Sequence, residues 1–436
     1  MNNFRLKLPV RKILRELDNT LLLTYLALMI IGFLAVLSSK GAIAEVGWFS
    51  IIAVIFKQLF FIGISLSGAV LSYIFFKRYL KHQSFLWLSS VLLVFSLILV
   101  LLIGREVNGA KSWILIGSMQ LQPSEFVKVF LIWWFGVTFS ATRQNQYALS
   151  SSLESLIQVK KDVWLERCLL YGPVALMVFL IKCQPDWGTN IVIFTLWFIL
   201  QLVANRYRRG AKILIPLVFC LALFIICFVP LSFLKFLPRH MYSRFLAFRE
   251  PFAHADAASF QMVRGFMAMS RGGWLGQGPG ASLFKTGYLP EASTDFIMAI
   301  LAEEWGFVGV IVILGLLLTL ILRLYYLALK ARTRTNKYIL TGVASLFLIQ
   351  SVINLGGLTA IIPLTGITLP FLSYGGSSLL AFSMAIGLAF ASLDVESSYL
   401  RLGKNRPSKR YSRQRFNPSD HARESLAPSS EKESTP

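Results

Sequence analysis

The sequence predicts an all-α membrane protein with about ten transmembrane helices and one large extracytoplasmic loop between helices 7 and 8. The 436-residue chain is 56% hydrophobic and 15% charged, whereas a soluble domain would carry about 25% charged residues. Apolar runs of about 20 residues recur, each long enough to cross a hydrocarbon core of about 30 Å as a helix. A transmembrane β-barrel would instead show short alternating segments.

The expected spans follow one another along most of the chain. They cover residues 20–38, 49–75, 84–103, 124–141, 168–183, 187–204, 213–231, 295–323, 338–362 and 367–393. The organisation expected is a basic N-terminus (1–18), a membrane domain (19–395) whose outer loop covers about 232–294, and a disordered, basic and polar tail (396–436).

The distribution of Lys and Arg indicates the topology. With the N-terminus inside, the cytoplasmic segments hold 30 of the 43 Lys and Arg residues and the outer segments hold 11. The positive-inside rule therefore predicts that both termini are cytoplasmic. The net charge of +22 then reflects loops at the inner membrane surface and a tail that contacts anionic lipids, and not nucleic acid. Neither the four Cys nor the four His residues show metal-ligand spacing.

The outer loop at 232–294 carries seven of the eleven outer cations, including Arg244, Arg271 and Lys285. Either this is a solvated surface loop, or it forms an anion site. The Gly-rich stretch SRGGWLGQGPGAS at 270–282 favours an anion site, because glycine lets backbone N–H groups approach a phosphate closely. A re-entrant turn explains the same stretch equally well, and a nucleotide-binding pattern is lacking.

Further polar motifs lie at the outer ends of the spans. Glu125 and Lys128 begin span four, either as a buried ion pair that positions the helix or as a substrate site. Trp113 suits the water–lipid interface, and Asp186 either caps a helix or faces outward. The segment 363–378 has two prolines and three glycines at membrane depth. It is expected to line a cavity with the outer loop, because irregular backbone is tolerated there only against protein or water.

The run GYLPEASTDFIMAILAEEWGF at 287–307 places four acids at the entrance of span eight. Asp295 is either a helix cap or a general base beside cations that hold an anionic leaving group. Glu303 and Glu304 lie roughly 12–13 Å deeper at 1.5 Å per residue. They are expected in a buried polar network, such as one with Lys57.

Five motifs together resemble the signature blocks of the SEDS family (shape, elongation, division and sporulation) over about residues 18–395. In order they are NGAKSWI…QPSEFVK, QPDWGT, FQMVRGFMAMSRGGWLGQGPGAS, KTGYLPEASTDFIMAILAEEWGF and PLTGITLPFLSYGGSSL. The resemblance implies a ten-span glycosyltransferase that polymerises lipid II into glycan strands. The stretch GGWLGQGPG and the basic cytoplasmic extensions favour the division branch of the family over the elongation branch.

The resemblance also implies site residues. Asp295 corresponds to the essential catalytic Asp of the family. Residues that correspond to substrate-binding positions or their neighbours are Arg244, Gln261, Lys285, Glu291, Lys111, Trp113, Lys128 and Glu125, with Gly272 and Gly273 in the loop block. Ser293 departs from the family pattern, which usually has His there, and Lys111–Ser112 replaces a commoner basic pair before Trp113. If the family's His orients substrate or tunes the Asp, this protein does so differently, and neither departure removes the predicted base or the cations.

The implied mechanism begins with Asp295, which takes the proton from the acceptor's 4-hydroxyl as that oxygen attacks the anomeric carbon of the lipid-linked donor. Polyprenyl pyrophosphate leaves. Arg244, Lys285, Lys111 or a divalent cation, Mg²⁺ or Mn²⁺, would offset its charge. No dedicated metal-ligand spacing accompanies these acids.

The implied partners are lipid II, membrane lipids, a class B penicillin-binding transpeptidase and other division proteins, at the septum in the inner membrane. A lipid II flippase and a catalytically silent division scaffold are the competing hypotheses. A flippase needs polar groups through the full membrane depth, whereas the acids here concentrate in the outer half. Asp295 and its basic neighbours argue against a scaffold.

Overall fold

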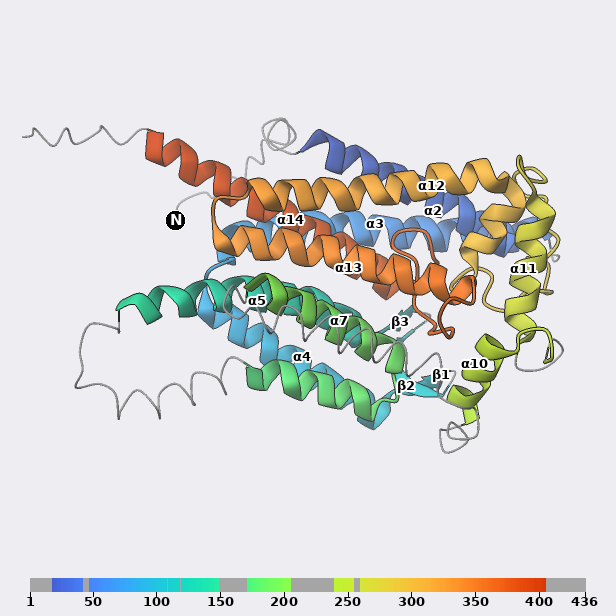
Figure 1. The fold of residues 1–436 in the computed structure, drawn as a ribbon, viewed down its shortest axis with the longest axis horizontal. Helices are drawn as coiled ribbons and strands as arrows, with labels where there is room; N and C mark the ends of the chain where they lie inside the picture. Colours follow the sequence, from blue (N-terminus) through green and yellow to red (C-terminus); the bar gives the residue numbers. More distant parts are fainter. Residues whose placement is uncertain are drawn as a thin grey trace, which may run out of the picture. The chain divides into compact units, whose positions relative to one another are not determined.

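The computed structural model describes residues 18–41, 47–107, 109–117, 119–148, 171–204, 239–254 and 259–404. The span expected at 213–231, the N-terminal residues 1–17 and the tail beyond residue 404 lie outside these ranges. Long helices dominate the described part and run side by side along a common direction (Figure 1). Seven of these helices are long and apolar enough to cross a membrane. The predicted all-α membrane class is confirmed.

The described helices that match predicted spans begin and end close to the expected residues. They are α2 (Asn19–Gly41), α3 (Gly47–Tyr79), α4 (Gln83–Ile103), α5 (Pro123–Ala148), the helix Tyr171–Cys183, α7 (Trp187–Ala204), α12 (Ile297–Lys330), α13 (Arg334–Leu358) and α14 (Gly376–Lys404). The last span begins nine residues later than expected, at Gly376 instead of 367, because the backbone stays irregular from residue 359 to 375.

The helices differ in how much of their apolar surface faces other protein. The apolar windows of α13 and α14 are each 78% buried, whereas those of α3 and α4 are 28% and 22% buried. Helix α13 packs against α12, α5 and α7 and therefore forms the centre of the bundle. The less buried helices expose large apolar side chains, as expected for surfaces that face lipid.

A small antiparallel sheet lies where an interfacial loop was predicted. Strands β1 (Arg105–Val107), β2 (Ala110–Ile116) and β3 (Met119–Leu121) pair in the order β1-β2-β3. The alternating apolar residues of this segment thus mark a strand with two different faces. Helices α10 (Arg239–Arg249) and α11 (Phe260–Gly272) lie at the same end of the bundle (Figure 1). We call this end the sheet end.

Helix α12 is interrupted at Gly306, whose φ of 64° and ψ of −170° are not helical. In an unbroken helix the N–H groups of residues 307 and 308 would donate to the carbonyls of residues 303 and 304. The loop 273–278 supplies carbonyls that accept from these two N–H groups and N–H groups that donate to these two carbonyls. The four hydrogen bonds are Phe307 N to Gly273 O (2.9 Å), Val308 N to Trp274 O (3.1 Å), Gln277 N to Glu303 O (2.9 Å) and Gly278 N to Glu304 O (2.9 Å). The loop therefore completes the broken helix, and we call it the splice loop.

Candidate functional site

Asp295 lies in a tight turn at residues 291–296 that leads into α12. Glu291 adopts a positive φ of 55°, and its carbonyl accepts the N–H groups of Thr294 and Phe296 at 3.1 and 3.2 Å. The N-cap position of α12 is Phe296, and no side chain caps it. The helix-cap interpretation of Asp295 is therefore wrong, and its carboxylate is not used to begin the helix.

Three successive carbonyls of this turn are held by α13 and the 359–375 segment. Ser293 O accepts from Tyr374 N (2.8 Å), Thr294 O from Ser373 Oγ (2.7 Å) and Asp295 O from Asn354 Nδ2 (3.1 Å). Asn354 also donates to the carbonyl of Ile367 at 2.8 Å. We call these bonds the backbone clamp, because they fix the main chain at Asp295 and leave its carboxylate unconstrained.

Arg244 of α10 and Asp295 converge on Gly366. The guanidinium donates to the Thr365 carbonyl at 3.1 Å. A Cβ built on Gly366 would lie 3.6 Å from Asp295 Oδ2 and 3.8 Å from Arg244 Nη2. Gly366 has a φ of 78°, which strongly favours glycine. The irregular segment therefore contacts the outer-loop helix and the acid at once. The cavity expected between 363–378 and the outer loop stays a prediction.

The environment of Asp295 changes its acidity. Burial raises the pKa of the Asp295 carboxyl to about 7, with a further increase from the charge of Glu291 and an opposing effect of Arg244. The side chain is packed within protein yet keeps part of its surface accessible, so it is both desolvated and reachable. A carboxylate that titrates near neutral pH is suited to accept a proton from a hydroxyl group.

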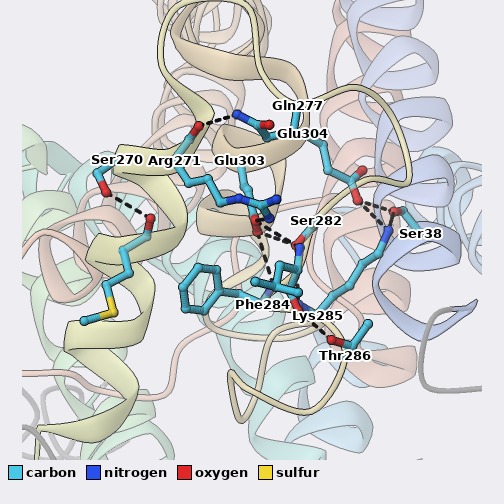
Figure 2. A network of polar contacts seen from close by, with 12 residues as sticks. Ser38, Ser270, Arg271, Gln277, Ser282, Phe284, Lys285, Thr286, Glu303 and Glu304 are labelled. Carbon is cyan, nitrogen blue, oxygen red and sulfur yellow. Dashed lines mark hydrogen bonds and ion pairs between the residues drawn. The ribbon is translucent and has the colours of Figure 1, made fainter.

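Glu303 lies deeper along α12 and is fully buried. Its carboxylate accepts from Arg271 Nη1 at 2.7 Å, from the Leu283 N–H at 2.9 Å and from the Ser282 hydroxyl. Figure 2 shows Arg271 and Ser282 reaching the carboxylate from both ends of the Gly-rich stretch. Glu303 therefore holds both ends of the Gly-rich stretch against α12.

Glu304 pairs with Lys285, whose ammonium lies 2.7 Å from Oε1, and Ser38 of α2 donates to the same oxygen at 2.6 Å (Figure 2). Lys285 is 4% exposed, so its charge is neutralised inside the protein. The expected buried network is confirmed, but Lys57 is not the partner in the described structure: it is exposed on α3. We call Glu303, Glu304, Arg271, Lys285, Ser38 and Ser282 the buried acid cluster.

The middle of the Gly-rich stretch uses its N–H groups within the protein. The N–H groups of Gly276, Gln277 and Gly278 donate to the carbonyls of Gly272, Glu303 and Glu304. Glycine is needed because a Cβ on Gly276 would lie 2.2 Å from the Glu304 carbonyl oxygen. These three N–H groups are therefore occupied within the protein, which favours the alternative interpretation of the stretch, a re-entrant turn.

Lys111 and Trp113 lie on β2, at the sheet end. The Lys111 ammonium donates to the carbonyls of Leu101 and Leu102 at 2.8 and 3.2 Å, at the C-terminus of α4, where a cation is favoured. Trp113 is half-buried opposite Arg105 on β1. Lys111 thus already has an intramolecular role.

Glu125 and Lys128 form a buried ion pair of 2.7 Å in the first turns of α5, with side chains 8% and 2% exposed. This favours the positioning interpretation over direct substrate contact. Asp186 accepts the Thr189 N–H at 3.1 Å and so begins α7, which confirms the helix-cap interpretation. Gln122 ties the two motifs together by donating to Asp186 at 2.9 Å.

Gln261 and Glu291 lie at the sheet end and are at least partly accessible to solvent. Gln261 is half-buried in the first turn of α11, and Glu291 is exposed. The Glu291 carboxylate accepts from the Thr294 hydroxyl at 2.5 Å, which directs it along the turn that carries Asp295.

Sequence reasoning did not single out Asn354, Gly366, Ser373 or Tyr374, which hold and border the Asp295 turn. A signal was present: an Asn at membrane depth in the ninth span, and hydroxyl and glycine residues in PLTGITLPFLSYGG. Polar groups at such depth are costly unless a protein partner satisfies them. Here the partners are the main-chain groups of the turn.

Comparison with known proteins gives a consistent result. The profile of the family described as "Cell cycle protein" (FtsW, RodA and SpoVE) matches residues 18–398. A probable peptidoglycan glycosyltransferase FtsW from Bacillus subtilis is 31% identical over 410 residues, covering 92% of this chain and 95% of the relative. The protein of the same name from Lactococcus lactis is 33% identical over 418 residues, covering 91% and 96%.

Two solved structures share the fold. One is described as "Structural coordination of polymerization and crosslinking by a peptidoglycan synthase complex"; it has a TM-score of 0.63, 27% identity, and covers 87% of this chain and 98% of its own. The other is the rod shape determining protein RodA of Thermus thermophilus, with a TM-score of 0.54, 25% identity and coverage of 87% and 97%.

Proposed function

The chain belongs to the FtsW, RodA and SpoVE family of cell cycle proteins and is a membrane peptidoglycan glycosyltransferase, and from that premise we propose that Asp295 is its catalytic base. The observation that carries this proposal is the geometry of the turn. The backbone clamp fixes the main chain at Asp295, the carboxylate is left unpaired by hydrogen bonds in the described structure, and its pKa is raised to about 7. A general base is most effective with such a pKa.

In the proposed reaction Asp295 accepts the proton of the acceptor sugar's 4-hydroxyl. The hydroxyl oxygen forms a bond to the anomeric carbon of the lipid-linked donor, and the bond from that carbon to the diphosphate oxygen breaks. Polyprenyl diphosphate leaves with the bonding electron pair. The proton on Asp295 then passes to solvent, and the glycan strand is one disaccharide longer.

Arg244 is the cation best placed to offset the charge of the leaving diphosphate. It lies beside Asp295 across Gly366, and its only hydrogen bond among the described residues is to a main-chain carbonyl. Lys285 and Lys111, the other cations considered, are occupied by Glu304 and by the end of α4. A charge that is free in the resting protein can stabilise charge that develops in the transition state.

A divalent cation fits this site only with help from the substrate. Among the described residues no group of three His, Cys, Asp or Glu side chains could hold a metal ion. Mg²⁺ is often bound by one or two carboxylates together with substrate phosphates. Asp295 and Glu291 would supply the carboxylates, and the ion would neutralise charge on the diphosphate.

Topology and assembly follow from the same proposal. The sheet end faces the outside of the cell, because the positive-inside rule places both termini in the cytoplasm. Substrate tails then stay in the outer leaflet while the sugars reach Asp295. We further propose a septal location and a class B penicillin-binding transpeptidase as partner, supported by the FtsW relatives and by the neighbour in a peptidoglycan synthase complex.

The test uses the purified full chain in detergent with fluorescent lipid II, alone and with the transpeptidase. Polymer on a gel is expected from the wild type and none from Asp295→Asn. Detergent removes the bilayer, so a transporter would form no polymer. Polymer from Asp295→Asn at the wild-type rate would remove Asp295 from the mechanism.

A further inference from the structure

The segment 365–374 reaches both Asp295 and Arg244, one near each of its ends. Near its C-terminal end, the Ser373 hydroxyl donates to a carbonyl of the Asp295 turn at 2.7 Å. At its N-terminal end, the Thr365 carbonyl accepts from the Arg244 guanidinium at 3.1 Å. We call residues 365–374 the bridging segment, because it contacts the proposed base and the proposed cation through different atoms.

Phe371 in the bridging segment has a backbone conformation that a bulky residue rarely adopts. Its φ is 65°, in the left-handed region where a large side chain is strained. The side chain is 3% exposed. Its ring contacts those of Tyr25, Phe347 and Phe382, on α2, α13 and α14, at centroid distances of 5.2, 5.2 and 5.6 Å. Such strain persists only where the surroundings impose it, so three helices fix the main chain at Phe371.

A short turn connects Phe371 to Ser373. The N–H groups of Leu372 and Ser373 donate to the Leu369 carbonyl at 3.3 and 3.2 Å. The Leu369 N–H donates in return to the Ser373 hydroxyl at 2.8 Å. These bonds close residues 369–373 into one unit. A displacement of the Phe371 main chain therefore moves Ser373 as well, and changes its bond to the turn that carries the acid.

Gly32, a buried residue in the middle of α2, leaves room for the Phe371 carbonyl against that helix. A Cβ built on Gly32 would lie 3.1 Å from the Phe371 carbonyl carbon, 3.2 Å from Leu372 Cα, and closer still to the Phe371 oxygen. All three are main-chain atoms, so no change of rotamer could make room for a methyl group. Gly32 therefore sets how closely α2 approaches the bridging segment.

Gly188, the second residue of α7, has the same relation to the other end of the bridging segment. It belongs to the motif QPDWGT, whose Asp186 caps this helix. A Cβ on Gly188 would lie 2.8 Å from the Thr365 carbonyl oxygen and 3.3 Å from Ile367 Cγ1. The same oxygen accepts from Arg244. Helix α7 therefore packs against the atom that holds the cation.

Resting on the proposed glycosyltransferase function, we propose that Gly32 and Gly188 are positioning residues: through the bridging segment, Gly32 places the base Asp295 and Gly188 places the cation Arg244. Neither glycine contacts the reacting groups. The relative position of base and cation is then set by how two helices pack on main-chain atoms. A misplacement of about 1 Å can cost about 10²-fold in rate, so one added methyl group at either glycine should lower kcat.

The first measurement is kcat and KM per folded protein, with fluorescent lipid II in detergent. Gly32→Ala and Gly188→Ala are expected to lower kcat about 10–10²-fold and to leave KM largely unchanged. The matched control is Gly387→Ala in α14. A Cβ there would lie 2.9 Å from Ser72 Cβ and closer still to the main-chain oxygen of Ala69. This variant should lose stability and keep the wild-type kcat.

Double variants show the route of each effect. Gly188→Ala should lower kcat in the wild-type background and much less in Arg244→Gln, because its effect passes through Arg244. Gly32→Ala should keep its effect in Arg244→Gln and show a smaller one in Ser373→Ala, which lacks the hydroxyl that bonds the Asp295 turn. A merely structural role would give the same loss in every background.

A measurement without turnover tests the cation arm separately. Arg244 lowers the pKa of Asp295, so displacing Arg244 with Gly188→Ala should raise that pKa. The pH above which Asp295→Asn becomes more stable than its parent should then move upward in melting curves. Gly387→Ala should leave this pH unchanged.

Variants that add no volume cover a failure to fold. If Gly32→Ala does not fold, Ser373→Ala tests the same link and should lower kcat at unchanged KM. If Gly188→Ala does not fold, the double variant with Ile367→Ala removes one of its two close contacts.

Two results would overturn the positioning role. One is a wild-type kcat in the alanine variants of both glycines. The other is a loss of equal size in every background, with an unmoved pH of the Asp295→Asn difference. Absence of polymer from the wild-type chain would instead refute the glycosyltransferase proposal, and the melting curves would still show whether Gly188 acts through Arg244 on Asp295.

Discussion

The acids at the beginning of α12 divide into two groups with opposite surroundings. Glu303 and Glu304 are 0% and 2% exposed, and each is bonded to a cation and a serine. Asp295 lies eight residues before Glu303, keeps part of its surface accessible, and shows no ion pair in the described structure although Arg244 is nearby. The same residue types at one end of one helix have thus been used in two ways.

The difference shows what pairing and accessibility each contribute. A buried acid with all its partners present fixes neighbouring segments, here the two ends of the Gly-rich stretch and α2, and breaking the pair leaves an uncompensated charge. An acid that is desolvated but unpaired keeps a raised pKa and can exchange a proton. Identical side chains therefore serve structure or chemistry according to whether a partner is supplied.

The largest expected effect is that of Asp295→Asn. The rate of polymerisation should fall about 10²–10⁴-fold, the usual contribution of a general base, with no loss of thermal stability. Asp186→Asn is the matched control, because Asp186 is an acid at the same end that caps α7, and Asn caps as well as Asp. Gel-based polymerisation and melting curves measure both. A melting temperature that falls with Asp295→Asn would place it with the structural acids.

Removing a cation from the buried acid cluster should give the opposite pattern. Lys285→Ala is expected to lower the free energy of unfolding by about 3–5 kcal/mol, because Glu304 is left buried and unpaired. The double variant Lys285→Met with Glu304→Gln should recover most of this loss and polymerise lipid II normally. Unchanged stability of Lys285→Ala with weaker lipid II binding would restore Lys285 as a substrate-binding cation.

The splice loop should be sensitive to a single methyl group. Gly276→Ala places a Cβ 2.2 Å from the Glu304 carbonyl oxygen at a φ of 82°, and strain of this kind costs about 1–3 kcal/mol. Gly315→Ala in α12 is the control, because nothing lies within 4 Å of its Cβ position. Denaturation in detergent should show a loss for the first variant and none for the second.

The smallest expected effect concerns pH. With the pKa of Asp295 at about 7, activity should rise about tenfold per pH unit below 7 and level off above it. Glu291→Gln removes a neighbouring negative charge that raises this pKa, so the midpoint should move to lower pH. An unmoved midpoint in the pH–rate profile would show that another group controls the rate.

The same pKa affects stability with a definite sign. The folded protein binds the Asp295 proton more tightly than the unfolded chain, whose carboxyl has the ordinary pKa of 3.8. The stability that the folded protein gains from this tighter proton binding is fully present below pH 3.8. It is lost as the pH rises through 7. Asp295→Asn should therefore gain stability relative to the wild type above pH 7, as melting curves across pH can measure.

Apolar run length predicted the described membrane helices and their order, because a span must be long and apolar wherever it packs. The same patterns placed Asp295 at the entrance of α12 and Glu125 and Lys128 at the start of α5. They did not predict the sheet at 105–121, since alternation over a few residues also suits an interfacial loop. They also extended the last span to 367, because Leu369 and Phe371 are apolar in a segment that is irregular.

The partners of charged residues could not be predicted from spacing. Lys285 and Arg271 were expected to face an anion, and only the fold shows that Glu304 and Glu303 reach them. The Gly-rich stretch was equally ambiguous: its glycines allow close approach to a phosphate or to a helix backbone. The interruption at Gly306 favours the helix backbone, and it becomes apparent only when both segments are placed side by side.

The backbone clamp binds main-chain carbonyl oxygens, which every amino acid possesses. Holding residue 293 by its carbonyl leaves the choice of side chain there open, so a serine can replace a histidine without disturbing the scaffold. Different side chains at residue 293 should then change how an incoming sugar is contacted. The location of Asp295 should stay constant from one variant to the next.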